Sequence, residues 1–103
     1  MQRYRVEITG SAEADINDIF EFMASDNKRA AFKWVEEIED QIDSLEKFPL
    51  RCAIIPEALE LGEKYRHIIH GNYRTIFRIE GPRVIIMRVF HSARLLDLEL
   101  FKK

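Results

Sequence analysis

Residues 65–91, YRHIIHGNYRTIFRIEGPRVIIMRVFH, decide the fold of this chain. Apolar and polar residues alternate along three segments of this stretch with the period of half-buried β-strands, namely Tyr65–His70, Tyr73–Ile79 and Val84–Phe90. Gly71-Asn72 has the length and composition of a two-residue hairpin turn, and Gly81-Pro82 marks a second turn. The stretch therefore predicts a three-stranded antiparallel meander.

The residues before this meander predict one strand and two helices. Tyr4–Ile8 alternates like a strand, Gly10 ends it, and Ser11 is suited to cap a helix. Apolar residues then recur at helical spacing in two stripes, Ala12, Ile16, Ile19, Phe20 and Met23, followed by Ala31, Val35, Ile38, Ile42 and Leu45. The polar cluster 25–27 separates the stripes, and Pro49 closes the second helix. We therefore expect an α+β fold: an N-terminal strand, an antiparallel helix hairpin packed on one sheet face, and the meander.

The composition sets bounds on the class of protein. The chain has 103 residues, 47% of them hydrophobic and 33% charged, which predicts one domain over residues 1–103 with its own core. Cys52 is the sole cysteine, which excludes an internal disulfide and a cysteine-based zinc site. No apolar run approaches the roughly 20 residues that cross a bilayer, and no signal peptide precedes the first strand, so we expect a cytoplasmic protein. For the tail 94–101, the sequence pattern does not distinguish a short helix from a strand.

The small net charge of −2 conceals a separation of charge along the chain. Up to Glu63 there are 7 basic and 15 acidic residues, a net charge of −8. From Lys64 onward there are 9 basic and 3 acidic residues, a net charge of +6, and all three histidines lie in this part. The helical half is thus predicted to be acidic and the sheet basic, and an asymmetry of this size bears on the choice of partner.

Counting outward from the two turns predicts which side chains share a face of the meander. The first turn pairs His70 with Tyr73 and His67 with Ile76, and the second pairs Ile79 with Val84, Ile76 with Met87 and Arg74 with Val89. The first predicted face forms the core and carries Ile68, Tyr73, Thr75, Phe77, Ile79, Val84, Ile86 and Phe90. The second, which antiparallel sheets can leave open, carries Tyr65, His67, Ile69, Arg74, Ile76, Arg78, Ile85, Met87, Val89 and His91. A slip of one residue would exchange the two assignments.

The second predicted face combines arginine, histidine and tyrosine, which suits a phosphodiester ligand. Arginine binds phosphate with two hydrogen bonds and stays charged, and histidine exchanges a proton near neutral pH. Cleavage of RNA at its own 2′-hydroxyl needs a base, a cation for the developing charge and an acid for the leaving oxygen. Arg74 could supply the cation and His91 the base or the acid, and this chemistry requires no metal or cofactor.

Several motifs of the chain are similar to one known superfamily. The run Tyr73-Arg74-Thr75-Ile76-Phe77-Arg78, a short turn, a hydrophobic strand and then His91-Ser92-Ala93-Arg94 resemble the C-terminal part of the RelE/ParE toxins. Phe48-Pro49-Leu50-Arg51-Cys52, Pro56-Glu57-Ala58 and Leu61-Gly62 resemble its ParE-like branch, often described as plasmid stabilisation proteins. The resemblance covers nearly the whole chain and implies the toxin half of a bacterial type II toxin–antitoxin system.

The resemblance implies two possible activities. RelE-like toxins cleave mRNA in the ribosome, whereas ParE-like toxins poison DNA gyrase, and both are small, cytosolic and held inactive by a cognate antitoxin. For a ribonuclease, the resemblance assigns catalytic roles to Arg74, Arg66 and His91. The residues expected to bind nucleic acid or another target are Tyr65, His67, Arg78 and Arg94. Arg74 could instead anchor a carboxylate of the helix hairpin, such as Glu36 or Asp40.

Three hypotheses therefore stand side by side. The first is a ParE-like toxin that acts on gyrase, the second a metal-independent endoribonuclease acting on ribosome-bound mRNA, and the third a non-toxic module that binds nucleic acid or protein on the same fold. For a toxin, we expect an extended or helical antitoxin segment across the helix hairpin and the sheet edge, in a toxin–antitoxin hetero-oligomer. That segment would bury apolar side chains and place acids against the basic strands.

Overall fold

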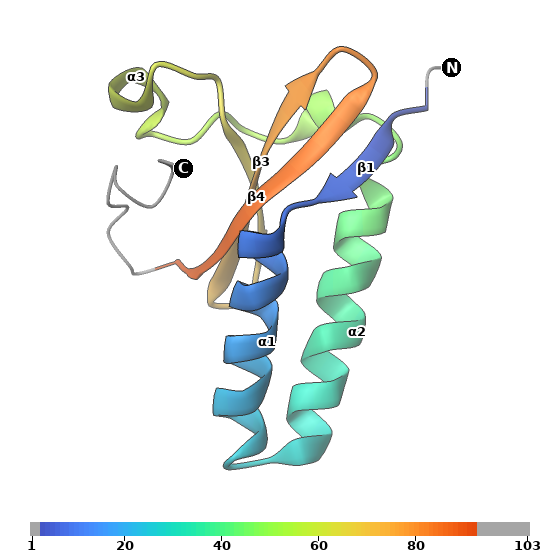
Figure 1. The fold of residues 1–103 in the computed structure, drawn as a ribbon, viewed down its shortest axis with the longest axis vertical. Coiled ribbons are helices and arrows are strands. Elements are labelled where there is room, and N and C mark those ends of the chain that lie inside the picture. Colours follow the sequence, from blue (N-terminus) through green and yellow to red (C-terminus); the bar gives the residue numbers. More distant parts are fainter. Residues whose placement is uncertain (1–2, 93–103) are drawn as a thin grey trace.

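A four-stranded sheet forms the centre of the molecule. The computed structural model describes residues 3–92, and the tail and Arg94 lie outside the described residues. The strands are β1 (Arg5–Ile8), β2 (Arg66–His70), β3 (Tyr73–Glu80) and β4 (Arg83–His91), in the order β1-β4-β3-β2. The predicted antiparallel meander β2-β3-β4 is confirmed, and β1 joins its β4 edge in parallel (Figure 1).

Two helices form the predicted hairpin, α1 (Gly10–Ala24) and α2 (Lys28–Ser44), which extends away from the sheet (Figure 1). The predicted cap at Ser11 is wrong. Thr9 caps α1, because the strand conformation continues to this residue and its Oγ1 accepts from the backbone N–H of Ala12. Asn27, the last residue of the polar cluster 25–27, caps α2, and α2 ends at Ser44, ahead of Pro49. None of the helices within residues 3–92 is both long and apolar enough to span a membrane.

The main core lies between the helix hairpin and one face of the sheet. Trp34, Ile38 and Ile42 of α2 are buried there against Phe77, Val84, Ile86 and Val89 of the sheet. The indole ring of Trp34 also meets the ring of Tyr73 edge-on, with 5.2 Å between the ring centroids. The two apolar stripes read from the sequence thus supply the helical side of this core, as predicted.

The pairing of β3 with β4 contains an irregularity that the sequence count did not foresee. Ile79 pairs with Val84 as predicted, but the register shifts between Ile76 and Phe77. Ile76 consequently pairs with Arg88 instead of Met87, and Arg74 with Phe90 instead of Val89. Met87 is the extra residue of a β-bulge. The predicted faces are therefore exchanged beyond it, since Val89 and His91 turn to the helix side and Phe90 turns to the second face.

The start of α1 holds β4 where β1 no longer pairs with it. The Thr9 hydroxyl lies 2.9 Å from the carbonyl oxygen of Ile86 and 3.1 Å from that of Met87. The Asp15 carboxylate accepts two hydrogen bonds from the Arg88 guanidinium, at 2.7 and 2.8 Å, and one from the backbone N–H of Val89, at 2.9 Å. Side chains of α1 and its cap thus form hydrogen bonds with backbone groups of β4 that have no strand partner at the bulge and beyond the end of β1.

The second face of the sheet is covered in part, contrary to the open face expected from the sequence. After α2 the chain forms a short 3₁₀ turn, η1 (Pro49–Arg51), and a one-turn helix, α3 (Ala58–Leu61). This connection packs onto a second apolar cluster made of the buried residues Ile55, Tyr65, Ile76 and Phe90, with Ala58, Leu61 and Met87 beside them. The long connection is therefore part of the fold, and it places polar side chains next to those of β2 and β3.

Removal of the Asp15 carboxylate is predicted to destabilise the fold strongly. Asp15→Ala leaves the half-buried Arg88 cation and a backbone N–H without their acceptor, so the free energy of unfolding should fall by about 3 kcal/mol. Asp15→Asn retains an acceptor for the Val89 amide and should lose less. Asp18→Ala, on the exposed side of the same helix, is the matched control. Urea unfolding measures all three, and equal stability of Asp15→Ala and Asp18→Ala would contradict the prediction.

Candidate functional site

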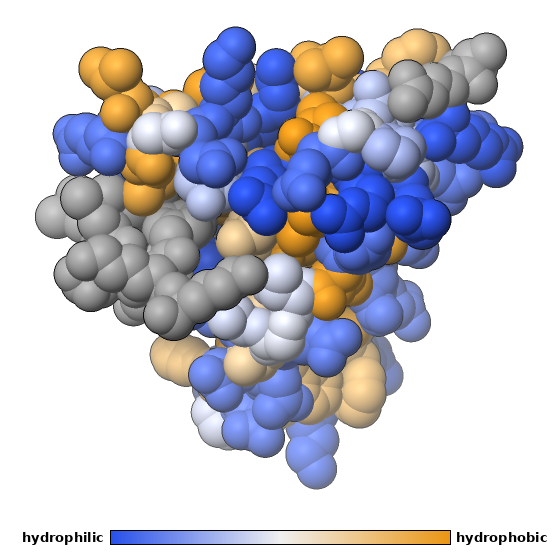
Figure 2. Space-filling view, turned by 45° about the horizontal axis from the view of Figure 1, so that its top comes forward, coloured by the Kyte–Doolittle hydropathy of each residue, from blue (hydrophilic) through white to orange (hydrophobic). Residues whose placement is uncertain are grey.

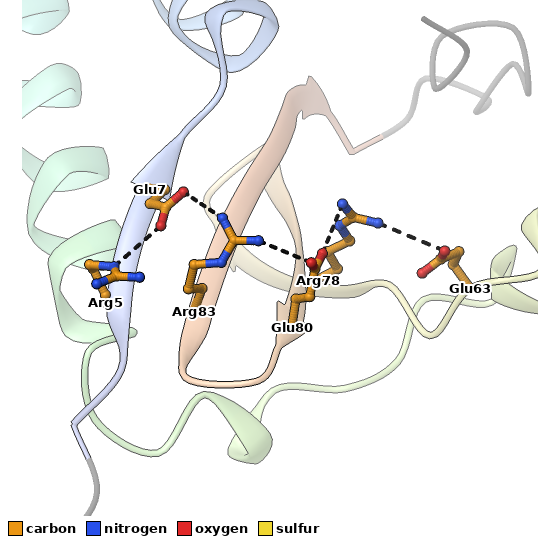
Figure 3. Close-up of polar contacts among 6 residues, drawn as sticks. All are labelled: Arg5, Glu7, Glu63, Arg78, Glu80 and Arg83. Carbon is orange, nitrogen blue, oxygen red and sulfur yellow. Dashed lines mark hydrogen bonds and ion pairs between the residues drawn. The ribbon is translucent and has the colours of Figure 1, made fainter.

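Most arginines of the sheet are bound to carboxylates of the same chain. Figure 2 shows strongly hydrophilic side chains gathered across the upper half of the molecule. Figure 3 shows that six charged side chains form one alternating row across β1, β4 and β3 to the connection before β2, in the order Arg5, Glu7, Arg83, Glu80, Arg78 and Glu63. The N···O distances along this row run from 3.0 to 3.8 Å. Three cations and three anions balance one another, so this part of the sheet is not the basic face that the charge count predicted.

Arg74 lies on the second face of the sheet and is bound to the connection that covers it. Its side chain is only 8% exposed, with Nη2 2.8 Å from Oε2 of Glu57 and Nη1 3.5 Å from Oε1. Nη1 is also 3.5 Å from Nδ1 of His67. Arg74 therefore anchors a carboxylate, as one reading of the sequence expected, but that carboxylate comes from the connection and not from Glu36 or Asp40.

Electrostatic coupling within this cluster changes the titration of its members. The hydrogen bond from Arg74 is the main reason why the pKa of Glu57 lies below its usual value. Burial lowers the pKa of His67, and the nearby Arg74 cation lowers it further. His67 is thus favoured as a neutral imidazole, and the Arg74–Glu57 pair as an ion pair. The Nε atom of Arg74 has no hydrogen-bond partner in the part of the chain that the structure describes.

Arg66 and His91 lie on the opposite face of the sheet from Arg74. Arg66 pairs with Phe77, and its Nη1 donates to the carbonyl oxygen of Cys52 at 2.6 Å. The His91 ring packs edge-on against the Tyr73 ring, with 5.3 Å between the ring centroids. The three residues expected to form a ribonuclease site are therefore not brought together, because the bulge turns His91 away from Arg74.

The other predicted binding residues that lie within residues 3–92 have structural partners as well. Tyr65 is buried in the second apolar cluster, and this burial raises the pKa of its phenol. Arg78 belongs to the row of ion pairs, and His67 stands beside Arg74. Among residues 3–92, no group of three or more His, Cys, Asp or Glu side chains could hold a metal ion.

An apolar groove runs between α1 and α2 on the outer side of the hairpin. It has a volume of about 390 Å³ and is lined by Ile8, Glu13, Ile16, Asn17, Phe20, Phe32, Val35, Glu39 and Ile42. The rings of Phe20 and Phe32 meet edge-on at 5.0 Å, yet Phe32 remains 61% exposed. An exposed aromatic ring in an apolar groove is typical of a surface that binds another chain.

Two polar residues that position these features were not singled out from the sequence. Asp15 belongs to none of the motifs described above, and Glu57 appears only within Pro56-Glu57-Ala58. Both find their partners through the tertiary fold, 73 and 17 residues away along the chain. No local pattern in the sequence signals such pairs.

Comparisons with known proteins agree with this fold. The family model described as the ParE toxin of the type II toxin–antitoxin system parDE matches residues 6–96. The chain is similar to a structure of the chromosomal ParDE toxin–antitoxin system from P. aeruginosa, with a TM-score of 0.69, 20% identity, and coverage of 86% of this chain and 96% of that chain. It is also similar to the toxin–antitoxin complex RelBE2 from Mycobacterium tuberculosis, with a TM-score of 0.61, 25% identity, and coverage of 91% and 97%. No curated protein matches the chain.

The Arg74–Glu57 pair is predicted to make stability depend on pH. Because the pKa of Glu57 is lowered by folding, the pair stabilises the fold above about pH 5 and loses this effect as the pH falls below about 4. Glu57→Gln should lower the free energy of unfolding at pH 7 by about 1 kcal/mol, a small value because the carboxylate is partly exposed.

Urea unfolding at pH 7 and at about pH 3.5 tests this dependence. The difference between the wild type and Glu57→Gln should shrink at the lower pH. Glu60→Gln, an exposed glutamate of α3, is the matched control and should behave as the wild type at both pH values. A difference that is equally large at both pH values would contradict the assigned role of the ion pair.

Proposed function

Because the chain belongs to the ParE toxin family of type II toxin–antitoxin systems, we propose that it inhibits growth by binding DNA gyrase and that a cognate antitoxin holds it inactive. Binding is favoured over RNA cleavage by one observation. Arg74, Arg66 and His91, the residues that would form a ribonuclease site, are divided between the two faces of the sheet. Gyrase is the target that the resemblance to ParE-like toxins implies.

The chemistry of RNA cleavage supports the same choice. A base, a cation and an acid must surround one phosphate, within hydrogen-bond reach of the reacting oxygens. Here the guanidinium of Arg74 is bound to Glu57 beneath the connection, and His91 lies on the other side of the sheet. A surface that binds a protein needs no such convergence, and it can use apolar side chains that remain exposed.

The antitoxin is proposed to occupy the groove between α1 and α2. Both similar structures are toxin–antitoxin systems, which supports a partner of this kind. An amphipathic helix of the antitoxin would lay its apolar face against Ile16, Phe20 and Phe32. Glu13 and Glu39 line the same groove and favour basic residues at the edge of that helix. This differs from the acids expected from the sequence, because the arginines of the sheet already have carboxylate partners.

Two assays on the purified chain separate the proposed activity from its alternative. We expect the wild type to inhibit DNA supercoiling by gyrase and to leave mRNA intact in a translation extract. His91→Ala should retain the inhibition, because this residue has no catalytic role in a binding toxin. Cleavage of ribosome-bound mRNA that disappears in Arg74→Ala, with supercoiling unaffected, would support the ribonuclease instead. The absence of both effects would favour a non-toxic module.

The groove is tested by two phenylalanines with similar exposure. Phe32→Ser removes an aromatic ring from the groove and should weaken antitoxin binding by about tenfold or more. Phe22→Ser removes a ring that is 69% exposed on α1 but does not line the groove, and it serves as the matched control. Titration calorimetry with the cognate antitoxin measures both affinities. Equal affinities would place the antitoxin elsewhere on the toxin.

A further inference from the structure

The turn after α2 holds an aromatic residue in an unfavourable backbone conformation. Phe48 has φ 51° and ψ 50°, the left-handed region, and it is the one non-glycine residue with a positive φ among residues 3–92. Bulky residues rarely adopt this region, because the Cβ atom crowds the following carbonyl oxygen. The ring is 59% exposed, so packing in the core does not offset the strain. Strain of this kind persists only where surrounding contacts impose it.

Two arginines impose this conformation from either side of the turn. Arg51 Nη1 donates to the carbonyl oxygens of Lys47 and Phe48, at 2.8 and 2.9 Å, and Nη2 donates to the Ser44 hydroxyl at 3.0 Å. Beyond the turn, Arg66 binds the carbonyl oxygen of Cys52. These bonds brace the backbone of the turn, and thereby the direction in which Phe48 and Leu50 leave it, before any partner arrives.

The braced turn borders an apolar hollow. The hollow has a volume of about 540 Å³ and is lined by Tyr4, Phe48, Pro49, Leu50 and Arg51. Leu50 is 61% exposed. A rigid aromatic ring beside a hollow of this kind resembles the centre of a protein interface.

The charges around this hollow differ from those of the sheet. Within residues 3–92, no carboxylate lies within ion-pair distance of Lys47, Arg51 or Arg66, whereas Arg74, Arg78, Arg83 and Arg88 each have an acidic partner. Glu46, the acid next to Lys47 in the chain, is bound to Arg3 at 2.9 Å. The turn thus presents positive charge without an acidic partner next to exposed apolar side chains, and this combination suits an acidic segment.

We propose that Phe48, Leu50 and the hollow beside them form the surface through which this toxin binds its protein target, by receiving a large apolar side chain from an acidic segment. This inference rests on the proposed function only in requiring a protein target. The surface shares no lining residue with the groove between α1 and α2, so antitoxin and target contact different side chains. It also lies at the opposite end of the molecule from the turn that joins the two helices (Figure 1).

The experiment uses substitutions that remove the apolar contact and spare the fold. Phe48→Asn deletes the ring, and asparagine tolerates the left-handed conformation, so its Tm should be unchanged or higher by a few degrees. Leu50→Ser is compared with Leu59→Ser, because Leu59 is 93% exposed on α3 and lies outside the hollow. Growth arrest on induction, inhibition of gyrase supercoiling, and antitoxin affinity are measured for each variant.

The proposal predicts a separation of these readouts. Phe48→Asn and Leu50→Ser should lose about tenfold or more in growth arrest and gyrase inhibition, with antitoxin affinity unchanged. Leu59→Ser should match the wild type in every readout. Lys47→Glu should weaken the inhibition and flatten its dependence on salt, because it repels an acidic partner.

The remaining outcomes overturn the proposal or one part of it. Full toxicity of Phe48→Asn and Leu50→Ser overturns it, as does an equal loss of antitoxin affinity, which would assign the surface to the antitoxin. An unchanged Lys47→Glu overturns the acidic character of the target. If the wild type arrests growth without acting on gyrase, the proposed target is wrong. The growth arrest caused by each variant then tests the proposed surface without the gyrase assay. If the wild type arrests no growth, both proposals are overturned.

Discussion

The contact between Asp15 and β4 is the constraint beside which the last strand changes register, and with it the direction of the predicted site residue His91. One carboxylate binds the Arg88 guanidinium and the backbone N–H of Val89, at the point where β1 ends and the register of β4 has shifted. These bonds hold β4 at Arg88 and Val89, the two residues that directly follow the bulge. The first turns of α1 thus contact β4 in the register in which Val89 and His91 face the helices and Phe90 faces the connection.

This register separates groups that the alternation of the sequence places together. His91 contacts Tyr73 on the helix side, whereas Arg74 contacts Glu57 beneath the connection. A sheet without the bulge would bring both to one surface and would offer a cation and a proton carrier to the same phosphate. The bulge thus has a chemical consequence as well as a geometric one. It leaves a scaffold whose polar groups are bound within the fold, and this favours a toxin that acts by contact.

Local patterns predicted the elements of the fold well, and contacts between distant segments account for the rest. Alternation and helical spacing identify strands and helices because each element has one apolar side, and the turn at Gly71-Asn72 determines the pairing of β2 with β3. The stretch 84–90 is apolar at every position except Arg88, so it lacks the alternation that would show where the bulge falls. Ser11 and Thr9 are both capable caps, and only the end of β1 decides between them.

The charges of the chain also show that the sequence alone does not reveal contacts between distant segments. A count along the chain places a net charge of +6 on the sheet half, yet pairing across the fold neutralises Arg74, Arg78, Arg83 and Arg88 with carboxylates that come mostly from the acidic half.

What remains for recognition is largely apolar, a groove along the hairpin and a braced turn at the far end of the sheet. Two separate apolar surfaces allow a small chain to be held by one partner and to act on another, because affinity for each depends on its own exposed rings. Positive charge without an acidic partner persists at the turn, where Arg51 and Arg66 bind backbone oxygens that do not neutralise it. Of the cations at this turn only Arg66 belongs to the basic part of the sequence, whereas Lys47 and Arg51 come from the acidic part. The surviving positive charge is therefore a product of the fold, and it lies beside a strained residue that is exposed to solvent.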